Sequence, residues 1–319
     1  MGTFENLLGH IIDLEFTTHE SMINAALLWD LEEYQLDSGS FKGTMNAVHT
    51  LHTQIASTFR SNGVFIKGEI PKNSYLFASV ESEGKITHNG LNILEDELIV
   101  LNENDQVDFT ASSAVNDMTI AIDKDFFDAA FKNYFNESFE YDTLNKRIQL
   151  KENTGTVFRY VVKMMVAELM LQGSKLQNDP SFHEKTEEEI LQLLFENMDL
   201  YKERKKVLES ELNADKIRQY IEKNYKMNIC FSELCCSNKL SERTLRLSFK
   251  NLFGLSPKQY HISYRLGKIH HAFLRANSNL ETVESIAYDY GFTHMGRFST
   301  TYKYMFGNKP SYTLKNSSL

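Results

Sequence analysis

The sequence predicts an α+β protein: an N-terminal β-barrel with flanking helices, followed by an all-α domain in which a long helix joins two helix-turn-helix units. Three observations lead to this class. Short alternating runs of apolar and polar residues occupy about 17–122, the apolar spacing changes to three and four residues after Ile122, and one motif recurs near the end of the chain. A chain of 319 residues, 42% of them hydrophobic, is long enough to bury two separate cores.

The barrel prediction depends on runs at 63–68, 97–101 and 117–122, which alternate apolar and polar residues and are separated by Gly, Asn and acidic clusters. Such runs are typical of strands in a β-sandwich or barrel. Residues 17–59 are ambiguous, because 35–41 suggests a strand and turn whereas its flanks fit helix or strand. We place the barrel at about 17–122.

Helices are expected at about 123–208, beginning with a cluster of aromatic residues spaced three and four apart at 126–135 and continuing with patterns at 156–172 and 186–208. The acidic run 186–189 is interpreted as a helix start, since carboxylates stabilise a helix N-terminus. The basic stretch 202–206 is interpreted as the solvated end of the same helix. A domain boundary is predicted near 210–214, which gives domains of 1–211 and 212–319.

The net charge of −9 is divided unevenly along the chain. Residues 212–319 carry 16 Lys and Arg against 7 Asp and Glu, whereas residues 1–211 carry 18 against 36. A basic C-terminal third can neutralise phosphates, and the acidic remainder would be repelled by them. Contact with a nucleic acid is therefore expected from the C-terminal domain alone.

The recurring motif reads Phe249-Lys250-x-x-Phe253-Gly254-x-x-Pro257 and then Tyr302-Lys303-x-x-Phe306-Gly307-x-x-Pro310, with an offset of 53 residues. A Gly shortly before a Pro is typical of a helix that ends at a Gly cap, and each copy follows a short amphipathic stretch and a turn. Two copies of one helix-turn-helix unit are therefore predicted, which indicates DNA as the partner.

In the first unit, a short helix around Leu234 and a turn at 237–240 precede Ser241, which is expected to cap the second helix. At about 100° per residue, the inward face of that helix carries Leu245, Phe249 and Leu252, and its outward face carries Arg243, Arg246, Leu247 and Lys250. In the second unit, the inward residues are Phe298, Tyr302 and Met305, and the outward residues are Gly296, Ser299, Thr300 and Lys303. Between the units, 257–276 is expected to form one helix of about 30 Å, nearly one turn of DNA.

The C-terminal domain closely resembles the DNA-binding domain of AraC/XylS-type bacterial transcription regulators over about 213–314. The resemblance rests on Ser241-x-x-x-Leu245-x-x-x-Phe249-Lys250-x-x-Phe253-Gly254-x-Ser256-Pro257-x-x-Tyr260, then Arg265-Leu266, Ile286-Ala287-x-x-x-Gly291-Phe292 and Phe298-Ser299-x-x-Tyr302-Lys303-x-x-x-Gly307-x-x-Pro310-Ser311. It implies that bases of double-stranded DNA are contacted by Arg243, Arg246, Leu247, Met295, Gly296, Ser299 and Thr300, and phosphates by Ser241, Lys250 and Lys303.

Two positions depart from the family pattern, because many relatives have Arg where this chain has Leu247 and Thr300. The direct guanine contact from each of these positions cannot form here. We expect Arg246 to replace the first contact and the second unit to hold mainly the DNA backbone.

The N-terminal half resembles the cupin-like sensor domain of many of these regulators through Gln35-Leu36-x-x-Gly39-x-Phe41-x-Gly43. The resemblance implies a regulator that acts on promoter DNA and RNA polymerase and is controlled by a small-molecule effector or by homodimerisation. Trp29, Phe59 and Phe65 are candidates for an effector pocket, although aromatic residues in a barrel are more often plain core.

Two other hypotheses are weighed. One is an architectural or protein-regulated DNA binder without an effector. The other is a cupin-type metal enzyme that uses His49, His52 and His88. The enzyme hypothesis lacks the usual His-x-His followed by Glu, and the sequence has no phosphate-binding loop or nucleophile elbow. No catalytic residue, metal or cofactor is therefore expected.

The start of the chain lacks the basic and apolar segments of a signal peptide, and no apolar run is long enough for a membrane span. A cytoplasmic protein that does not contact a membrane is expected. Cys230, Cys235 and Cys236 are odd in number and lack zinc spacing, so we expect small core residues in a reducing compartment.

Overall fold

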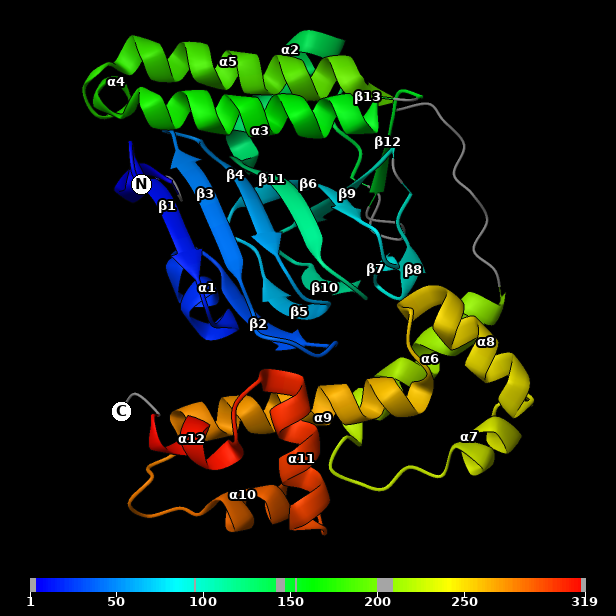
Figure 1. Cartoon of the computed structure of the whole chain (residues 1–319). Helices are drawn as coiled ribbons and strands as arrows, with labels where there is room; N and C mark the ends of the chain where they lie inside the picture. The colour runs from blue at the N-terminus through cyan, green and yellow to red at the C-terminus, as the bar shows by residue number, and fades with distance from the viewer. Residues whose placement is uncertain (1–3, 95, 142–146, 153, 200–208, 317–319) are drawn as a thin grey trace.

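The computed structural model describes residues 4–94, 96–141, 147–152, 154–199 and 209–316. Two antiparallel sheets lie within 11–199, and every element from Glu209 onward is a helix, which confirms the α+β class. We call residues 4–199 the sheet region and residues 209–316 the reader. Figure 1 shows the reader on one side of the sheets and the two longest helices of the sheet region on the other.

The larger sheet has the strand order β1-β3-β4-β11-β6-β9-β12-β13, and the smaller has the order β2-β5-β10-β7-β8. The strands are β1 (Ile11–Phe16), β2 (Asp30–Gln35), β3 (Gly43–His49), β4 (Thr53–Arg60), β5 (Val64–Glu69), β6 (Ser74–Ser82), β7 (Ile86–His88), β8 (Leu91–Asn92), β9 (Glu97–Asn102), β10 (Gln106–Ala111), β11 (Val115–Asp123), β12 (Arg147–Leu150) and β13 (Met198–Asp199). The three predicted runs are confirmed as β5, β9 and β11. Side chains of both sheets, such as Ile66 and Leu76, share one apolar core.

The predicted limits of the strand-rich segment are too narrow. Among the described residues no strand joins the two sheets into one closed barrel, and strands also occur outside 17–122. Strand β1 begins at Ile11 and pairs with β3, while β12 and β13 add to the far edge beside β9 in a stretch that was expected to be helical. Edge strands this short, with partners distant in sequence, leave little periodic signal.

The helical elements of the sheet region are the 3₁₀ turn η1 (Glu5–Leu7) and helices α1 (His19–Ala25), α2 (Lys124–Phe135), α3 (Gly155–Leu171), α4 (Gly173–Asn178) and α5 (Pro180–Asn197). The predicted start of α5 at 186–189 is wrong. The side chain of Asp179 caps the helix by accepting bonds from the backbone N–H groups of Ser181 and Phe182, and Pro180 follows as the first helical residue.

Glu187 therefore lies within α5, where it is buried and accepts 2.6 Å hydrogen bonds from the Thr50 hydroxyl and the His52 backbone N–H. These bonds attach α5 to the β3–β4 turn, so this carboxylate serves packing rather than capping. The predicted basic helix end at 202–206 lies outside the described residues.

The reader consists of α6 (Glu209–Lys223), α7 (Phe231–Ser237), α8 (Glu242–Phe253), α9 (Pro257–Arg275), α10 (Val283–Asp289), α11 (Met295–Phe306) and α12 (Pro310–Lys315). The two predicted units are confirmed as α7–α8 and α10–α11, and the joining helix as α9. Gly254 and Gly307 end α8 and α11 with φ angles of 69° and 79°, a left-handed conformation that glycine adopts without strain. The predicted domain boundary at 210–214 falls inside α6 and stays a prediction.

Helix α9 lies directly against β2. A Cβ atom at Gly267 would come within 3.0 Å of Tyr34 Cβ, so the absence of a side chain permits this close approach. Lys268 Nζ donates to the Tyr34 hydroxyl at 2.6 Å, and His271 Nε2 donates to the Glu33 carbonyl oxygen at 2.8 Å. The reader is thus bonded to an edge strand of the smaller sheet.

Arg218 of α6 forms a second junction between the reader and the sheets. Its guanidinium is fully buried and lies 2.7 Å from Asp108 of β10, 2.8 Å from Asp215 and 2.7 Å from Glu222. Glu222 also accepts from the Tyr260 hydroxyl of α9 at 2.8 Å. Because one arginine satisfies carboxylates from both parts, loss of its charge would remove the ion pairs of Asp108 and Asp215, whose side chains are largely buried.

None of the helices in the described ranges combines the length and apolarity that a membrane span requires.

Candidate nucleic-acid interface and effector cavity

Helix α8 presents a basic outer face. The Ser241 hydroxyl accepts from the Thr244 backbone N–H at 3.0 Å, which confirms the predicted N-cap, and the predicted inward residues Leu245, Phe249 and Leu252 are buried. Arg243, Arg246 and Lys250 are exposed, and Leu247 is half exposed. The predicted contact residues of this unit therefore share one accessible helix face.

Helix α11 presents a smaller and less charged face. Gly296, Thr300 and Lys303 are exposed, whereas Met295 and Ser299 are partly buried. No heavy atom lies within 4 Å of a Cβ placed at Gly296, so the first turn is open to a ligand. The Thr300 hydroxyl donates to the Gly296 carbonyl at 3.0 Å, which occupies its proton within the helix.

Arg297 is also exposed on the first turn of α11, next to Gly296. It was not among the predicted contact residues. Arg297 lies about 100° from the inward Phe298, the same angle at which Ser299 is predicted to face outward. Its guanidinium is the cation of the second unit nearest to the start of α11.

Arg265 of α9 holds the two units together. Its Nε donates to the Tyr225 carbonyl at 2.6 Å, while its Nη2 and Nη1 donate to the carbonyls of Met227 at 2.5 Å and Gly291 at 3.2 Å. Tyr225 and Met227 precede α7, and Gly291 lies between α10 and α11. One buried side chain therefore fixes the start of the first unit relative to the turn of the second.

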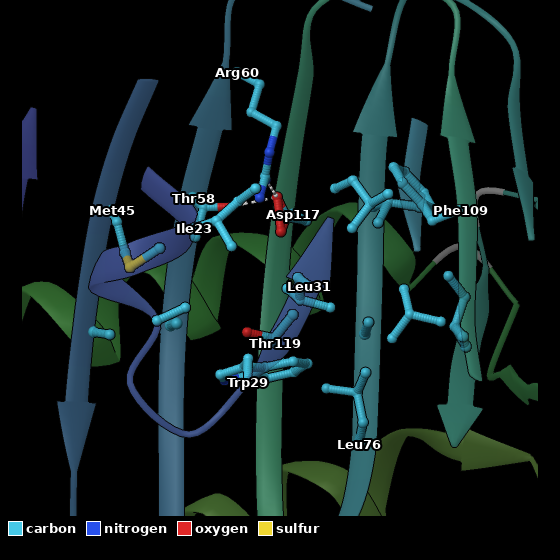
Figure 2. Close-up of a pocket in the computed structure, with 18 of the residues that line it drawn as sticks. Ile23, Trp29, Leu31, Met45, Thr58, Arg60, Leu76, Phe109, Asp117 and Thr119 are labelled. Carbon is cyan, nitrogen blue, oxygen red and sulfur yellow. Dashed lines mark hydrogen bonds and ion pairs between the residues drawn. The ribbon is translucent and has the colours of Figure 1, made fainter. Parts of the chain in front are cut away.

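A cavity of about 110 Å³ lies between the two sheets and beneath α1. Most of its lining is aliphatic or aromatic, with Gln54, Thr58, Arg60, His88, Asp117 and Thr119 as polar groups. Figure 2 shows Arg60 and Asp117 pointing toward one another, with Trp29 and Leu76 elsewhere around the cavity. Trp29 lines this cavity, whereas Phe59 and Phe65 are absent from its lining, and Phe65 packs toward the reader instead.

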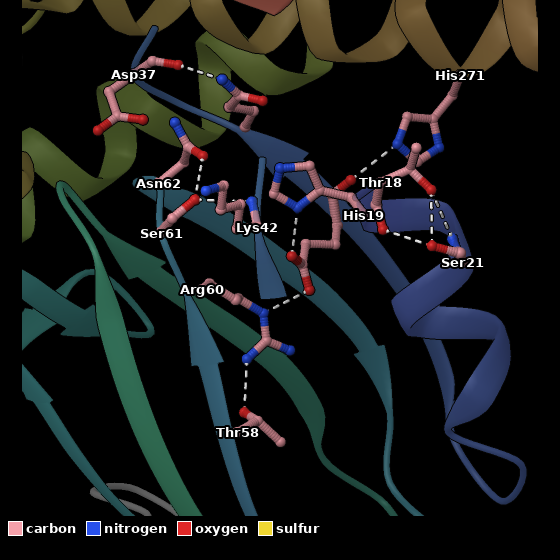
Figure 3. Close-up of polar contacts among 12 residues, drawn as sticks. Thr18, His19, Ser21, Asp37, Lys42, Thr58, Arg60, Ser61, Asn62 and His271 are labelled. Carbon is pink, nitrogen blue, oxygen red and sulfur yellow. Dashed lines mark hydrogen bonds and ion pairs between the residues drawn. The ribbon is translucent and has the colours of Figure 1, made fainter. Parts of the chain in front are cut away.

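The polar side of the cavity connects to the reader through Glu33. Arg60 Nε donates to Glu33 Oε2 at 2.8 Å, and His19 Nδ1 lies 2.5 Å from Glu33 Oε1. Burial alone would raise the pKa of Glu33, but the charges and hydrogen bonds of Arg60 and His19 outweigh it and hold the pKa at about 2. Glu33 belongs to β2. Figure 3 shows Arg60 and His19 close to this strand, and His271 extending toward it from α9.

The histidines weighed as metal ligands and the three cysteines each have a defined environment in the protein. His52 Nδ1 lies 2.9 Å from Glu187, and burial lowers the pKa of His49 to about 4. Within the described ranges no group of three or more His, Cys, Asp or Glu side chains could hold a metal ion. Only Cys235 is a core residue as predicted, since Cys230 and Cys236 are exposed.

Residues 234–316 match the family described as a helix-turn-helix domain. The XylDLEGF operon transcriptional activator of Pseudomonas putida is 36% identical over 101 residues, which cover 32% of this chain and 32% of that protein. The match thus spans about a third of that relative. The XylDLEGF operon transcriptional activator 2 of the same organism is 31% identical over 121 residues, which cover 38% of this chain and 77% of that protein.

Among solved structures, ToxT from Vibrio cholerae O395 is similar to 91% of this chain, over 98% of its own length, with 15% sequence identity and a TM-score of 0.30.

Proposed function

Because the chain belongs to the AraC/XylS family of helix-turn-helix transcription regulators, we propose that it is a sequence-specific DNA-binding activator of transcription. The observation that carries this proposal is the pair of helix-turn-helix units that each end at a left-handed glycine, are joined by α9 and are clamped by Arg265. Two helices held in this way can enter successive major grooves on one face of DNA, an arrangement that usually requires two protein chains.

The two units have different tasks in this proposal. In the first, Arg243 and Arg246 read base edges beside Leu247, while Ser241 and Lys250 bind phosphates. A bidentate contact between Arg246 and guanine contributes about 1–3 kcal/mol of discrimination. In the second unit, Met295, Gly296, Ser299 and Thr300 approach the bases closely, and Lys303 binds the backbone.

The sheet region is the proposed control element. A small, largely apolar effector would occupy the cavity with its polar end near Arg60 and Asp117. Arg60 holds Glu33, and the Glu33 carbonyl accepts from His271, so a ligand that moves Arg60 changes a contact with α9. The effector would thereby shift the population of reader orientations, and with it promoter occupancy and contact with RNA polymerase. A homodimer in the cytoplasm is the assembly we propose.

The DNA-binding proposal is tested by selecting bound fragments from a random DNA library with the full-length protein at near-physiological salt. Enrichment of a motif with two blocks about one helical turn apart is expected. Retention of DNA without any enriched motif would instead indicate an architectural binder, whose affinity follows salt and DNA flexibility.

The effector proposal is tested separately, by screening small apolar compounds for an increase in melting temperature and then measuring DNA affinity with each compound that binds. The expected compound changes both quantities. Compounds that bind in the cavity but leave DNA affinity, oligomeric state and transcription unchanged would contradict the coupling.

A further inference from the structure

The cavity between the two sheets has a cluster of bonded polar side chains in its wall. Figure 2 shows Thr58, Arg60 and Asp117 together, with Trp29 and Leu76 farther along the cavity. Arg60 Nη1 donates to Asp117 Oδ1 at 2.7 Å and to the Thr58 hydroxyl at 2.9 Å. The Thr58 hydroxyl in turn donates to the same oxygen of Asp117. A ligand in this largely apolar cavity would meet the cluster with its polar end.

One donor and one acceptor of this cluster remain available to a ligand. Arg60 Nη2 and Asp117 Oδ2 have no hydrogen-bond partner among the residues that the structure describes, although both side chains line the cavity. The two side chains are only 7% and 17% exposed, and polar atoms this deep in a protein usually have a partner. A ligand group that satisfies both atoms must accept one hydrogen bond and donate another.

The charges around Arg60 disfavour an anionic ligand. Its guanidinium already faces two carboxylates, since Nε lies 2.8 Å from Glu33 and Nη1 lies 2.7 Å from Asp117. His19 bonds the other oxygen of Glu33 but does not line the cavity. A ligand carboxylate would therefore be a third negative group beside one guanidinium, and a buried charge without a counter-ion of its own is costly.

A cationic ligand fits the cluster no better. An ammonium group could donate to Asp117 Oδ2, but it would lie beside the positive charge of Arg60 and has no lone pair with which to accept from Nη2. A neutral hydroxyl or primary amide both donates and accepts, and it adds no charge to a buried site.

The volume of the cavity limits the rest of the ligand. At about 110 Å³ it is somewhat smaller than the apolar cavity of about 150 Å³ that holds benzene in another protein. Its mostly aliphatic and aromatic lining favours a hydrocarbon body, whose burial stabilises the complex. The body of the ligand should therefore be about one small ring.

We propose that the cavity takes a small neutral ligand of about one ring, whose hydroxyl or primary amide accepts from Arg60 Nη2 and donates to Asp117 Oδ2. The inference rests on the proposed effector function and names the chemical class of the effector. It is measured by ligand binding without DNA. Its failure is thus distinguishable from a failure of DNA binding or of the coupling between effector and reader.

The test is calorimetric titration of the full-length protein with four probes that share a cyclopentane ring. Cyclopentanol and cyclopentanecarboxamide are the neutral probes and are expected to bind. Cyclopentanecarboxylate has nearly the shape of the carboxamide but is an anion, and cyclopentylamine has nearly the shape of the alcohol but is a cation at neutral pH. Each charged probe should bind about tenfold or more weakly than its neutral counterpart.

Asp117→Asn tests whether this carboxylate sets the preference. The variant keeps an oxygen for Thr58 and Arg60 but removes one negative charge, so the preference for the carboxamide over the carboxylate should fall about tenfold. Asp13→Asn is the matched control, because Asp13 is exposed on β1 and does not line the cavity. Its preference should equal that of wild type, and circular dichroism establishes that both variants are folded.

The proposal is overturned if neither neutral probe binds wild type, or if a charged probe binds as tightly as its neutral counterpart. An unchanged preference in Asp117→Asn, or an equal change in Asp13→Asn, would also overturn it. If Asp117→Asn does not fold, the comparison of the four probes on wild type still decides the ligand class.

Discussion

Arg246 is the side chain on which sequence discrimination by the first unit depends in our proposal. It is exposed on α8 beside Leu247, whose apolar side chain can contact a thymine methyl group but cannot donate a hydrogen bond to guanine. Arg243 lies nearer the start of the same helix, where the positive end of the helix dipole also favours a phosphate. In our proposal, the sequence specificity of the first unit therefore depends on few side chains.

Replacement of Arg246 by Ala is expected to reduce preference for the selected site over random DNA by roughly 5- to 150-fold, equivalent to about 1–3 kcal/mol. The loss should be confined to base pairs in one half of the site, because only the first unit is altered. Competition binding against a panel of single-base variants of the site measures this. Equal loss on selected and random DNA would contradict a base-reading role.

Lys303→Ala provides the contrasting expectation at the same scale. Lys303 is exposed in the last half of α11, and we propose that it contacts phosphate. Its removal should weaken binding to all sequences by a similar factor. It should also reduce the slope of log K against log salt concentration by the amount that about one phosphate contact contributes. A change in sequence preference would show instead that Lys303 reads bases.

Helix α8 as an element depends on its cap. Ser241→Ala removes the bond to the Thr244 backbone N–H and should lower the free energy of unfolding by about 1 kcal/mol. Ser241→Asp keeps a capping oxygen and adds a charge that the helix N-terminus favours, so its stability should be retained. If Ser241 meets phosphate as proposed, Ser241→Asp nevertheless binds DNA more weakly than Ser241→Ala.

Urea unfolding measures the stability of the two variants, and DNA titration measures their affinity. Ser241→Asp should be the more stable variant and the weaker DNA binder. Thr282→Asp is the matched control, because Thr282 caps α10 by accepting from the Ser285 backbone N–H and is not a proposed DNA contact. Affinities that merely follow the stabilities of the variants would assign Ser241 to capping alone.

The relation between the two units depends on Arg265. Arg265→Lys retains the charge but cannot reach carbonyls of Tyr225, Met227 and Gly291 with one ammonium group. Loss of these bonds should cost about 1–3 kcal/mol of stability. Affinity should fall more for a DNA site with both half-sites than for a single half-site, since the spacing of the units is loosened.

Arg275→Lys, on the exposed end of the same helix, is the control for that exchange. Equal losses on full and half sites in Arg265→Lys would mean that Arg265 stabilises the reader without setting the spacing of its units.

At the scale of the whole molecule, stability should depend on pH through buried histidines. Burial, together with the charges of Arg275 and His19, lowers the pKa of His271 to about 4, although its hydrogen bond to the Glu33 carbonyl opposes the shift. The unfolded chain takes up this proton near pH 6.5, whereas folded His271 does so only near 4. The free energy of unfolding should therefore fall as pH falls from about 6.5 toward 4.

Urea unfolding at about pH 7 and about pH 5 measures this loss. His271→Gln keeps an N–H donor for the Glu33 carbonyl but does not titrate, so it should lose less stability than wild type over the same interval. His49, His261 and His270, whose pKa values burial lowers to about 4, about 4 and about 3, contribute to the remaining dependence. Identical losses in wild type and His271→Gln would contradict a contribution from this contact.

The reader could be predicted from its sequence in unusual detail. Its caps at Ser241, Gly254 and Gly307, its joining helix and its buried faces all follow from interactions among residues three or four apart. Helix α5 carries the same kind of signal in Asp179 and Pro180, but the acidic run at 186–189 is more conspicuous and predicts a later start. In the sheet region, residues paired across the sheets are far apart in sequence, and local patterns located only the central strands.

The sequence by itself determined the α+β class, the two repeated units and their outward residues, because these depend on local periodicity and on the conformations that Gly, Pro and Ser favour. Only the tertiary structure decided which polar groups meet. Arg218 bonds to Asp108 across 110 positions, Gln35 reaches the Met305 carbonyl across 270, and Arg60 joins the cavity to Glu33 and so to α9. Such contacts depend on how the sheets and the reader pack together, and no spacing along the chain encodes that arrangement.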